Sequence, residues 1–428
     1  MHDKIFSVAI IGCGSRGRDA YGKLFKKHSE KWNVVSVCDV NEKNLENARI
    51  LFGTESKNCF SDETEFFKEK RADVLVVATQ DRDHVRMAKK GLLLGYDVLL
   101  EKPISKDRKE IEELLSLQKK TGGKIFVCHV LRYAPAFVKI KEIINSGRLG
   151  KIMSVNSMEQ VGYSHFAHSY VRGNWRNEKE SSPVIMAKSC HDLDLLQDYI
   201  GAKCKTAFSV GGVKFFNKEN KPEGAADRCK DCKYINSCQY SAENIYVKRW
   251  KENPSEDRWP YNVVCKEIPI TEEKLRRAYE GNQYGRCVFA CDNDVCDTQD
   301  TVFEFENGVV ASFNLTAVTS RMARKIGVYG SLGYIDYDES NGIIKVGIYG
   351  EKISEIKEED LLKNLEEDSF GHGGGDFMMI NDLYDVLSGK ENSRTCLENS
   401  VESHLMAIAA EESRKTGKAV RVHEKRSD

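Results

Sequence analysis

The feature that most constrains the fold is a glycine-rich turn directly after a short apolar run near the amino terminus. Residues 6–11 read FSVAII, and residues 12–17 follow the pattern GxGxxG before a helix-compatible stretch. In a strand–turn–helix unit, the first glycine permits the tight turn, the second lets the backbone approach a pyrophosphate, and the third lets the helix pack closely on the strand. The amino terminus of the helix then faces the phosphates. The turn therefore predicts a dinucleotide-binding unit, with five residues at the cofactor: Gly12, Gly14, Ser15, Arg16 and Gly17.

An acidic residue follows the next predicted strand. Residues 33–38 form an apolar run that leads into Asp39. At this place in a dinucleotide-binding unit, a carboxylate accepts hydrogen bonds from the adenosine ribose hydroxyls. The carboxylate would also repel a 2'-phosphate, and no basic residue follows at once in the sequence VNEKN. Asp39 therefore favours NAD over NADP; the alternative interpretation is a helix-capping Asp in a glycine-rich turn.

Strand and helix patterns continue to alternate as far as residue 100. Residues 73–78 and 96–100 are apolar strand candidates, and helix patterns cover residues 41–51 and 84–94. Continuous apolar strands are typical of a parallel sheet with both faces covered. Ligands bind such sheets outside the carboxyl ends of the strands. Four residues that follow these strands are therefore expected at the cofactor: Thr79, Glu101, Lys102 and Pro103.

Length and charge narrow the class of protein. A chain of 428 residues fits two domains. Its 65 Lys and Arg nearly balance its 66 Asp and Glu, so no binding of nucleic acid or of an acidic membrane is expected, and a small molecule is the predicted partner. No run approaches the ~20 apolar residues of a membrane span, and no signal-peptide pattern precedes the first strand. We therefore expect a cytoplasmic protein whose 14 cysteines are free thiols or metal ligands.

The pattern changes after about residue 151. Runs such as TVFEFENG and VVASFNLTAV alternate apolar and polar residues, with Gly and Asn between them. This alternation is typical of antiparallel hairpins. The second half of the chain is therefore expected to contain an antiparallel sheet.

Several motifs are spread over most of the chain. They are IGCGSRG, Asp39, LLEKP, the segment from Arg132 to Pro135 with IINSGRLGKI after it, CHDLD, HGGGD and AAEESRKTGKAV. In these motifs the chain resembles the Gfo/Idh/MocA family of oxidoreductases. The resemblance implies a Rossmann-type α/β NAD-binding domain, which we place at residues 1–125. It also implies an α+β domain with an open-faced, mostly antiparallel sheet, which we place at residues 126–428, and a homo-oligomer, either a dimer or a tetramer.

The resemblance also implies two catalytic residues. In the family, the lysine of EKP lies beside the nicotinamide and the reacting hydroxyl, which indicates Lys102, and the histidine of CHDLD is catalytic, which indicates His191. Physical chemistry agrees, because an ammonium group can bind the alcohol oxygen and stabilise the negative charge that develops on it. A histidine, with its usual pKa near ~6.5, can take the hydroxyl proton. The structural alternatives are a solvated surface pair of Glu101 with Lys102 and a histidine satisfied in the core.

One position near His191 departs from the family pattern. Many members carry Asp four residues before this histidine, whereas this chain has Ala187, followed by Lys188. A carboxylate would raise the basicity of the histidine, and a nearby ammonium would lower its pKa. A helix over residues 182–200 would place Lys188, His191 and Asp194 on one face. Lys188 and Asp194 are therefore predicted at the substrate without fixed roles, and Asp194 is the alternative partner that orients the histidine.

A loop before this helix is rich in aromatic and basic residues. Aromatic faces and planar donors suit a carbohydrate, since apolar sugar faces stack and hydroxyls need directional partners. A metal site at the two histidines is the less favoured alternative, because no carboxylate lies beside them, and partial burial in a loop is the other. Five loop residues are predicted to contact the substrate: His165, His168, Tyr170, Arg172 and Trp175.

Residues 215–300 read as a charged, cysteine-rich insertion. Two thiolates in a CxxC turn can reach one ion, and further cysteines could complete a tetrahedral zinc site. Such an ion would stabilise a polar segment with little core of its own. Buried free thiols are the alternative, and Cys291 or Cys265 could replace the fourth ligand. The prediction is a structural zinc ion held by Cys229, Cys232, Cys238 and Cys287.

The predicted function is NAD-dependent oxidation or reduction of a secondary hydroxyl of a sugar, sugar derivative, glycoside or polyol. An alternative is a redox-neutral reaction, in which NAD assists glycoside cleavage or epimerisation through a keto intermediate. From another class, the fold could serve as a non-catalytic sensor of NAD or a ligand, because folds do not fix functions. Loss of Lys102 or His191 would have favoured the sensor, and both are present.

Overall fold

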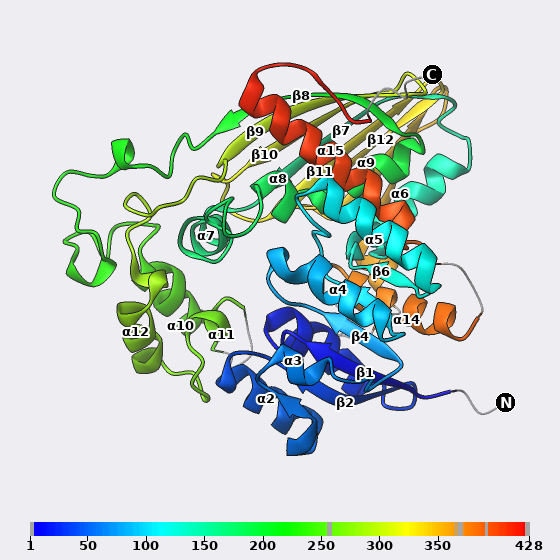
Figure 1. Ribbon diagram of the computed structural model, residues 1–428. Coiled ribbons are helices and arrows are strands. Elements are labelled where there is room, and N and C mark those ends of the chain that lie inside the picture. The colour runs from blue at the N-terminus through cyan, green and yellow to red at the C-terminus, as the bar shows by residue number, and fades with distance from the viewer. Residues whose placement is uncertain (1–3, 255–258, 364, 366–370, 390–392, 424–428) are drawn as a thin grey trace.

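The computed structural model describes residues 4–254, 259–363, 365, 371–389 and 393–423, and these contain two sheets (Figure 1). The first sheet has six strands in the order β3-β2-β1-β4-β5-β6, and all its neighbours pair in parallel. Its strands are β1 (Phe6–Ile11), β2 (Trp32–Cys38), β3 (Cys59–Phe60), β4 (Val74–Val77), β5 (Asp97–Leu100) and β6 (Ile125–Val127). The connecting helices are η1 (Ser15–Gly22), α1 (Lys23–Lys27), α2 (Glu42–Phe52), α3 (Glu63–Phe66), α4 (His84–Leu93) and α5 (Arg108–Thr121).

The first sheet is covered on both faces, as the continuous apolar strands predict. Along β1, Val8 and Ile10 belong to one core cluster, while Ala9 and Ile11 belong to another. The first of these clusters also contains residues of α14 (Gly375–Leu387), which comes from the far end of the chain. The predicted Rossmann-type fold is confirmed, and a late helix completes its core.

Two glycines of the first turn are required by close backbone contacts. Gly12 has φ +92°, and a Cβ there would lie 2.3 Å from the carbonyl oxygen of Ala78. A Cβ on Gly17 would lie 2.0 Å from the carbonyl oxygen of Gly12. No atom lies within 4 Å of a Cβ built on Gly14. The first and third glycines therefore close the turn, and the second borders open space where a ligand can approach.

The second sheet has nine strands in the order β14-β13-β12-β11-β7-β10-β9-β8-β15. All its neighbours pair antiparallel except β7 with β10. The predicted mostly antiparallel sheet is confirmed. Its strands are β7 (Ile152–Gln160), β8 (Cys204–Gly212), β9 (Thr298–Phe305), β10 (Val310–Thr316), β11 (Ala323–Gly330), β12 (Gly333–Asp338), β13 (Ile343–Ile348), β14 (Ser354–Lys357) and β15 (Val420–Arg421).

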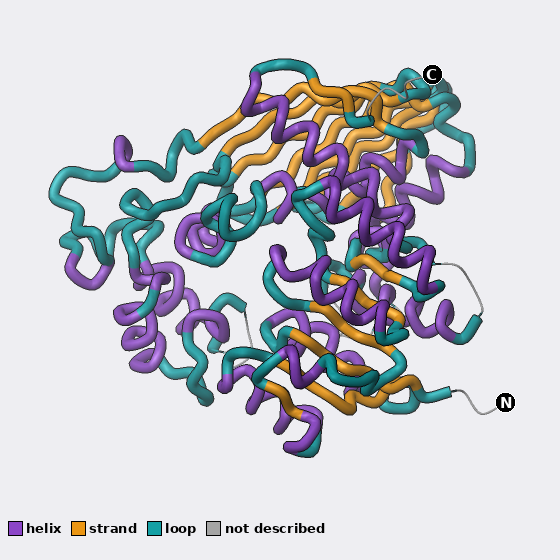
Figure 2. Tube along the Cα trace, in the orientation of Figure 1, coloured by secondary structure: helices purple, strands orange, loops and turns teal. Residues whose placement is uncertain are grey.

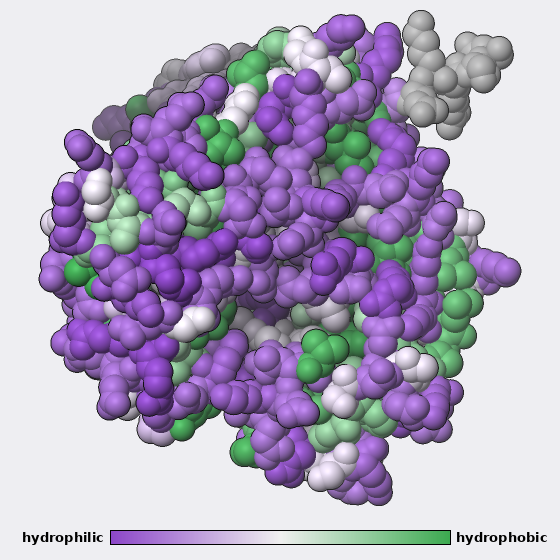
Figure 3. All heavy atoms as spheres, turned by 60° about the vertical axis from the view of Figure 1, so that its left-hand side comes forward, coloured by the Kyte–Doolittle hydropathy of each residue, from purple (hydrophilic) through white to green (hydrophobic). Residues whose placement is uncertain are grey.

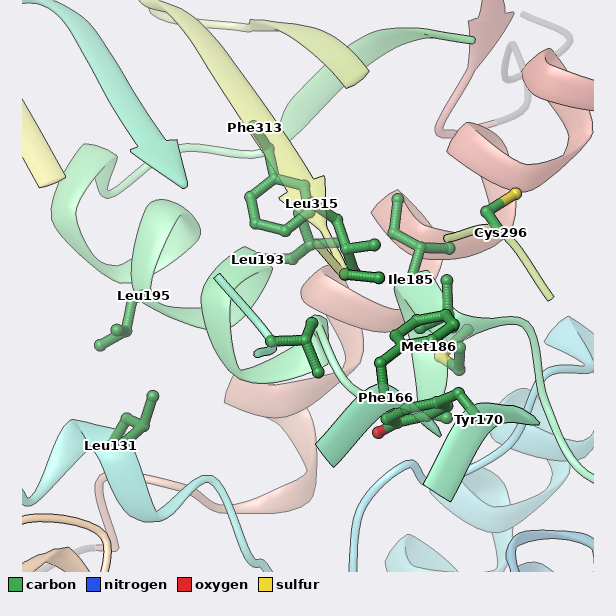
Figure 4. Packing of buried hydrophobic residues seen from close by; sticks show 14 of the residues in the cluster. Leu131, Phe166, Tyr170, Ile185, Met186, Leu193, Leu195, Cys296, Phe313 and Leu315 are labelled. Atoms are coloured by element: carbon green, nitrogen blue, oxygen red, sulfur yellow. The ribbon is translucent and has the colours of Figure 1, made fainter. Parts of the chain in front are cut away.

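Helices pack on one face of the second sheet, between it and the first sheet (Figures 1 and 2). Figure 4 shows Phe313 and Leu315 of β10 meeting Ile185 and Leu193 from the helices below, and all four belong to one buried cluster. This packing fixes α9 (Cys190–Ile200), the helix that carries the candidate catalytic residue His191. The helices of this half are α6 (Pro135–Asn145), α7 (Tyr163–Phe166), η5 (Ala167–Arg172), α8 (Val184–Ala187), α9 (Cys190–Ile200), α13 (Glu358–Leu362) and α15 (Leu397–Thr416).

The cysteine-rich insertion lies between β8 and β9 and extends toward the first sheet (Figure 1). On that side the surface of the molecule is largely hydrophilic (Figure 3). Contrary to the expectation of a polar segment with little core, the insertion has an apolar interior that includes Ile245, Tyr246, Leu275 and Tyr279. Its helices are η8 (Glu243–Lys248), α10 (Arg249–Glu252), α11 (Tyr261–Val264) and α12 (Glu272–Gly281). Among the described residues, no helix of the protein is long and apolar enough to cross a membrane.

Candidate active site

Lys102 lies where the two halves of the chain meet. It follows the end of β5, and its Nζ donates a hydrogen bond to the carbonyl oxygen of Ala187 at 2.9 Å. The predicted continuous helix over residues 182–200 is broken at this point into α8 and α9. The hydrogen bond from Lys102 to the Ala187 carbonyl lies at this break. It links the segment after a Rossmann strand to the start of the helix that carries His191.

His191 lies in the first turn of α9, in a protected position beside Lys102. Only 4% of the residue is exposed, and its Nδ1 has no hydrogen-bond partner among the described residues. Burial, and after it the ammonium group of Lys102, lower the pKa of His191 well below its ordinary value of 6.5. The imidazole is therefore neutral near pH 7, which is the form that accepts a proton.

Asp194 is paired with an arginine. Its carboxylate is held by Arg132, with Nε to Oδ2 at 2.6 Å and Nη2 to Oδ1 at 2.8 Å. Asp194 is 1% exposed, and no hydrogen bond to His191 is present. The bidentate pair ties α9 to the segment after the first domain. The structure therefore gives Asp194 a partner other than the histidine.

Lys188 lies at the end of a buried chain of charged side chains. Its Nζ is 3.3 Å from Glu159 Oε1, and the other carboxylate oxygen of Glu159 is 2.6 Å from Arg324 Nη2. Arg324 Nε also binds Asp192 Oδ1 at 2.9 Å. Burial lowers the pKa of Lys188, although Glu159 opposes the shift. Lys188, His191 and Asp194 thus have different surroundings, contrary to the shared helix face that the sequence predicts.

The predicted substrate loop divides between a cavity and the interior. His165 borders a cavity of about 460 Å³ that is also lined by Trp259, Arg249 and Glu252 from the insertion. Its ring lies 4.6 Å from that of Trp259. Of the five predicted loop residues, His165 is therefore the one that lines this cavity.

The other loop residues make internal contacts. His168 stacks on Tyr284 at 4.7 Å, and Tyr170 is buried against Phe166. Arg172 is fully buried and donates to the carbonyl oxygens of Arg286 and Tyr240, so it supports the insertion. Trp175 Nε1 donates to Asp81 Oδ1 at 2.9 Å, which joins the loop to the end of β4.

The zinc prediction is not supported. Among the described residues, no group of three or more His, Cys, Asp or Glu side chains is placed to hold a metal ion. The sulfur of Cys229 accepts from the backbone N–H of Ala242 at 3.4 Å and from Arg172 Nη2 at 3.6 Å. All four predicted ligands are free thiols: Cys229, Cys232, Cys238 and Cys287.

The glycine turn and its neighbours form a cradle that fits a dinucleotide. Asp39 Oδ2 accepts from the N–H of Cys13 at 2.7 Å, which fixes the carboxylate beside the turn. Gly14 borders open space, and the buried Thr79 Oγ1 has no hydrogen-bond partner among the described residues. A free hydroxyl and an uncrowded backbone are what a bound dinucleotide can use. The lysine at the adjoining strand end, before the cis bond to Pro103, places the candidate catalytic group at the same edge.

The side chain of Arg16 faces inward rather than toward open solvent. Its Nε binds Glu101 Oε1 at 2.6 Å, and its Nη2 binds Asp376 Oδ1 at 2.7 Å. Glu101 also accepts from the hydroxyl of Tyr21 at 2.6 Å. Arg16 therefore joins the glycine turn, the EKP segment and the HGGGD segment, while its backbone remains available to a phosphate.

Several residues of this region escape sequence reasoning. The buried ion pairs of Glu159, Arg324 and Asp192 bring together three distant segments. No local spacing of residues in the sequence predicts them. His372 belongs to the HGGGD motif, which is visible in the sequence without a role. In the structure its ring lies 6.0 Å from that of His191. The motif itself is the signal that could have identified it.

The family follows from comparison with known proteins. Residues 6–129 match the family described as an oxidoreductase family with an NAD-binding Rossmann fold, and residues 141–422 match its C-terminal alpha/beta domain. The chain therefore belongs to the Gfo/Idh/MocA oxidoreductase family. It is an NAD-dependent oxidoreductase of that family, as the matching family model with its NAD-binding Rossmann fold shows.

Three distant relatives cover nearly the whole chain. YteT of Bacillus subtilis, named provisionally as an oxidoreductase, is 23% identical over 402 residues, which are 90% of this chain and 92% of YteT. The solved structure of levoglucosan dehydrogenase with NADH and levoglucosan has a TM-score of 0.73 at 16% identity, covering 98% of this chain and 100% of that one. WlbA dehydrogenase of Bordetella pertussis, solved with NADH and UDP-GlcNAcA, has a TM-score of 0.69 at 16% identity and covers 99% and 100%.

Proposed function

We propose that the protein oxidises a secondary hydroxyl of a sugar, sugar derivative, glycoside or polyol with NAD. The observation that carries the proposal is the meeting of Lys102 with the Ala187 carbonyl, immediately before the helix of His191. A cationic donor and a neutral histidine then share the edge of the dinucleotide cradle. This is the pair that removal of a hydroxyl proton requires, together with charge stabilisation at the oxygen.

Each residue has a defined part in this reaction. The Lys102 ammonium binds the alcohol oxygen and stabilises the negative charge that develops there. His191 takes the hydroxyl proton. Bound NAD supplies the hydride acceptor. Asp39, Thr79 and the backbone at Gly14 hold the dinucleotide, and Arg16 keeps the glycine turn in place through its two carboxylate partners.

The cavity beside His165 supports a carbohydrate-like substrate. It joins an aromatic ring, Trp259, to the charged groups of Arg249 and Glu252. An aromatic face can stack on a sugar, and the charged groups can bind hydroxyls directionally. Levoglucosan and UDP-GlcNAcA, bound in the two solved relatives, are carbohydrates as well.

A redox-neutral reaction is the second candidate. It is favoured by the extra basic groups near Lys102, since Lys188 and His165 both lie within its electrostatic reach. Cleavage or epimerisation through a ketone needs proton transfers beyond the first. Such a reaction would convert glycosides without net formation of NADH.

The first experiment measures NADH absorbance when the purified protein and NAD are mixed with free sugars, polyols and glycosides. We expect NADH with one group of compounds. We also expect Lys102→Met to lower kcat/KM by about 100- to 10,000-fold, the range of a lost general acid–base group. Lys109→Met, at an exposed lysine, is the matched control and should behave as the wild type.

The outcomes separate the two candidates. Equal activity of the Lys102→Met variant would contradict the proposed role of the lysine. Product without net NADH would favour the redox-neutral reaction. Binding of NAD without conversion of any compound would contradict both for the compounds tested.

A further inference from the structure

His372 stands at the mouth of the site, directly beside His191. The two ring centroids are 6.0 Å apart with an angle of 48° between the planes. His191 is 4% exposed, whereas the side chain of His372 is 38% exposed. One ring is therefore enclosed with the reacting groups, and its neighbour reaches solvent.

A carboxylate fixes the orientation of the outer ring. His372 Nδ1 lies 3.0 Å from Asp376 Oδ2, and Asp376 is itself held by Arg16. Burial opposes ionisation of Asp376, but Arg16 and His372 together hold its pKa below the ordinary value. Because the ionised carboxylate can only accept, the proton on Nδ1 points to it and the lone pair of the neutral ring is on Nε2.

The backbone of the HGGGD segment is held firmly around this ring. Among the described residues, His372 is the one non-glycine residue with positive φ, at 49°. A Cβ on Gly375 would lie 2.3 Å from the carbonyl oxygen of Val130, so the segment packs directly on the neighbouring turn. A side chain kept in an unfavourable backbone conformation at a site is a mark of functional constraint.

Oxidation of the proposed alcohol leaves a proton on a buried imidazole. His191 has no carboxylate partner among the described residues, and Lys102 disfavours its charged form. The ring of His129 also lies 6.0 Å from that of His191, but His129 and its own neighbour His404 are both fully buried. Of the two histidine rings beside His191, His372 is the one that is exposed to solvent.

We propose that His372, oriented by Asp376, carries the proton from His191 to solvent. This inference rests on the proposed function. With NAD bound, the cofactor would accept the hydride from the carbinol carbon, and His191 takes the hydroxyl proton. The proton then moves to Nε2 of His372, through one bridging water where the rings do not touch, and from His372 to solvent. One proton is released per NADH formed, and both imidazoles return to the neutral form.

Charged and titratable groups surround the two rings on every packed element. Asp376 and, through it, Arg16 face His372, while Lys102, His129 and His165 lie near His191 or His372. Glu358 approaches the backbone of the same segment at Gly373. Asp376 also anchors Arg16, so a change at Asp376 would disturb the cofactor turn. His372 is therefore the residue to change.

The test follows NADH and proton release together in a single turnover. The full-length protein is loaded with NAD and mixed rapidly with myo-inositol, D-glucose or levoglucosan in weak buffer with a pH indicator. In the wild type we expect proton release to coincide with NADH formation. In His372→Ala we expect the proton to lag at least about tenfold behind NADH, with kcat reduced and KM nearly unchanged.

Imidazole rescue distinguishes a relay from a structural role. Free imidazole at millimolar concentration should restore synchronous proton release in His372→Ala and have no effect on Lys102→Met. His372→Gln, a more conservative change, is made in parallel to separate misfolding from loss of the relay. His423→Ala is the matched control, because His423 also pairs with a carboxylate, Glu402, at 3.0 Å, near the carboxyl-terminal end of the chain.

The outcomes separate this inference from the proposed function. Synchronous release in both His372 variants, with normal turnover, would overturn the relay and leave the dehydrogenase function standing. A lag that imidazole does not shorten would also overturn it. If the wild type binds NAD but forms no NADH with these compounds, the proposed function fails for them and the relay fails with it.

Discussion

At the scale of single residues, the lysine–histidine pair determines how the site responds to pH. His191 must be neutral to accept a proton, and burial and Lys102 lower its pKa below 6.5. A base with a lowered pKa keeps its active form as the pH falls, and it loses activity only when the pH drops through that lowered value. Activity is therefore expected to fall at a lower pH than it would with a histidine of ordinary pKa.

This gives a prediction for the pH profile of kcat/KM. We expect activity to stay level from about pH 7.5 down to about pH 6.5 and to fall only at lower pH. His191→Asn should lower kcat/KM by about 100-fold or more and remove the acid limb. Steady-state NADH assays across this range measure it, and an acid limb centred above pH 6.5 would show that another group is the base.

Residue roles could be predicted from the sequence only where a short motif carries them. Lys102 and His191 could be predicted as catalytic residues because EKP and CHDLD are local motifs that carry the family resemblance, and their roles remain predictions. The surroundings of Asp194 could not be predicted, because Arg132 reaches it from another segment. His168 and Arg172 are buried because the insertion packs against them. This burial could not be predicted from the composition of the loop.

At the scale of elements, the glycines of the first strand–turn–helix unit have two different roles. One is needed for the turn to fold, and another leaves room for a ligand to bind. Gly17 is required by a backbone contact, whereas Gly14 borders open space. A side chain at position 17 must therefore distort the turn, while a side chain at position 14 fills only the space that a pyrophosphate would occupy. The alternation of strands and helices could be predicted from the sequence because hydrophobic periodicity is a local signal.

Two valine substitutions test this separation. Gly14→Val should leave the melting temperature of the free protein nearly unchanged and abolish the stabilisation that added NAD gives. Gly17→Val should lower stability by several kcal/mol, as overpacking of a tight contact does. Thermal unfolding with and without NAD measures both effects. Normal NAD affinity of the Gly14→Val variant would contradict the placement of the cofactor.

Two elements differ from the sequence prediction, and both make contacts with segments that are far away in the sequence. The helix predicted over residues 182–200 is interrupted between Ala187 and Cys190, at the point where the Ala187 carbonyl accepts a hydrogen bond from the distant Lys102. The insertion was expected to need an ion because its apolar residues show no simple period. Its interior is instead assembled from side chains that are far apart in sequence, such as Tyr246 and Tyr279.

At the scale of the whole molecule, the described helices pack on one face of the nine-stranded sheet and leave its outer face uncovered (Figure 1). Apolar side chains are exposed on β8, β9 and β10, and Phe208 on β8 pairs directly with Val302 on β9. Val210 and Val310 are exposed on the same strands. We propose that a second copy of the chain covers this face, which keeps the expected homo-oligomer as a prediction.

Measurement of molar mass in solution tests this prediction. Light scattering coupled to size-exclusion chromatography should give a multiple of the 48.5 kDa chain mass. Val302→Asp should shift the mass toward one chain at low micromolar concentration, since a charge on an apolar interface costs several kcal/mol when it is buried. Ile50→Asp, on the exposed side of α2, is the control. A wild-type protein of one chain mass would contradict the assembly.

The link between Arg16 and Asp376 has a consequence for synthesis of the protein. These two residues are 360 positions apart, and the same late segment supplies α14 to the core of the first sheet. At ordinary rates of translation the ribosome needs on the order of tens of seconds to make that length of chain. The newly made glycine turn must therefore wait, with its arginine lacking one of its two carboxylate partners and one side of its core exposed, until the segment around residue 376 has been made. Chaperones would encounter this half of the protein first, although it is the half whose pattern is easiest to recognise.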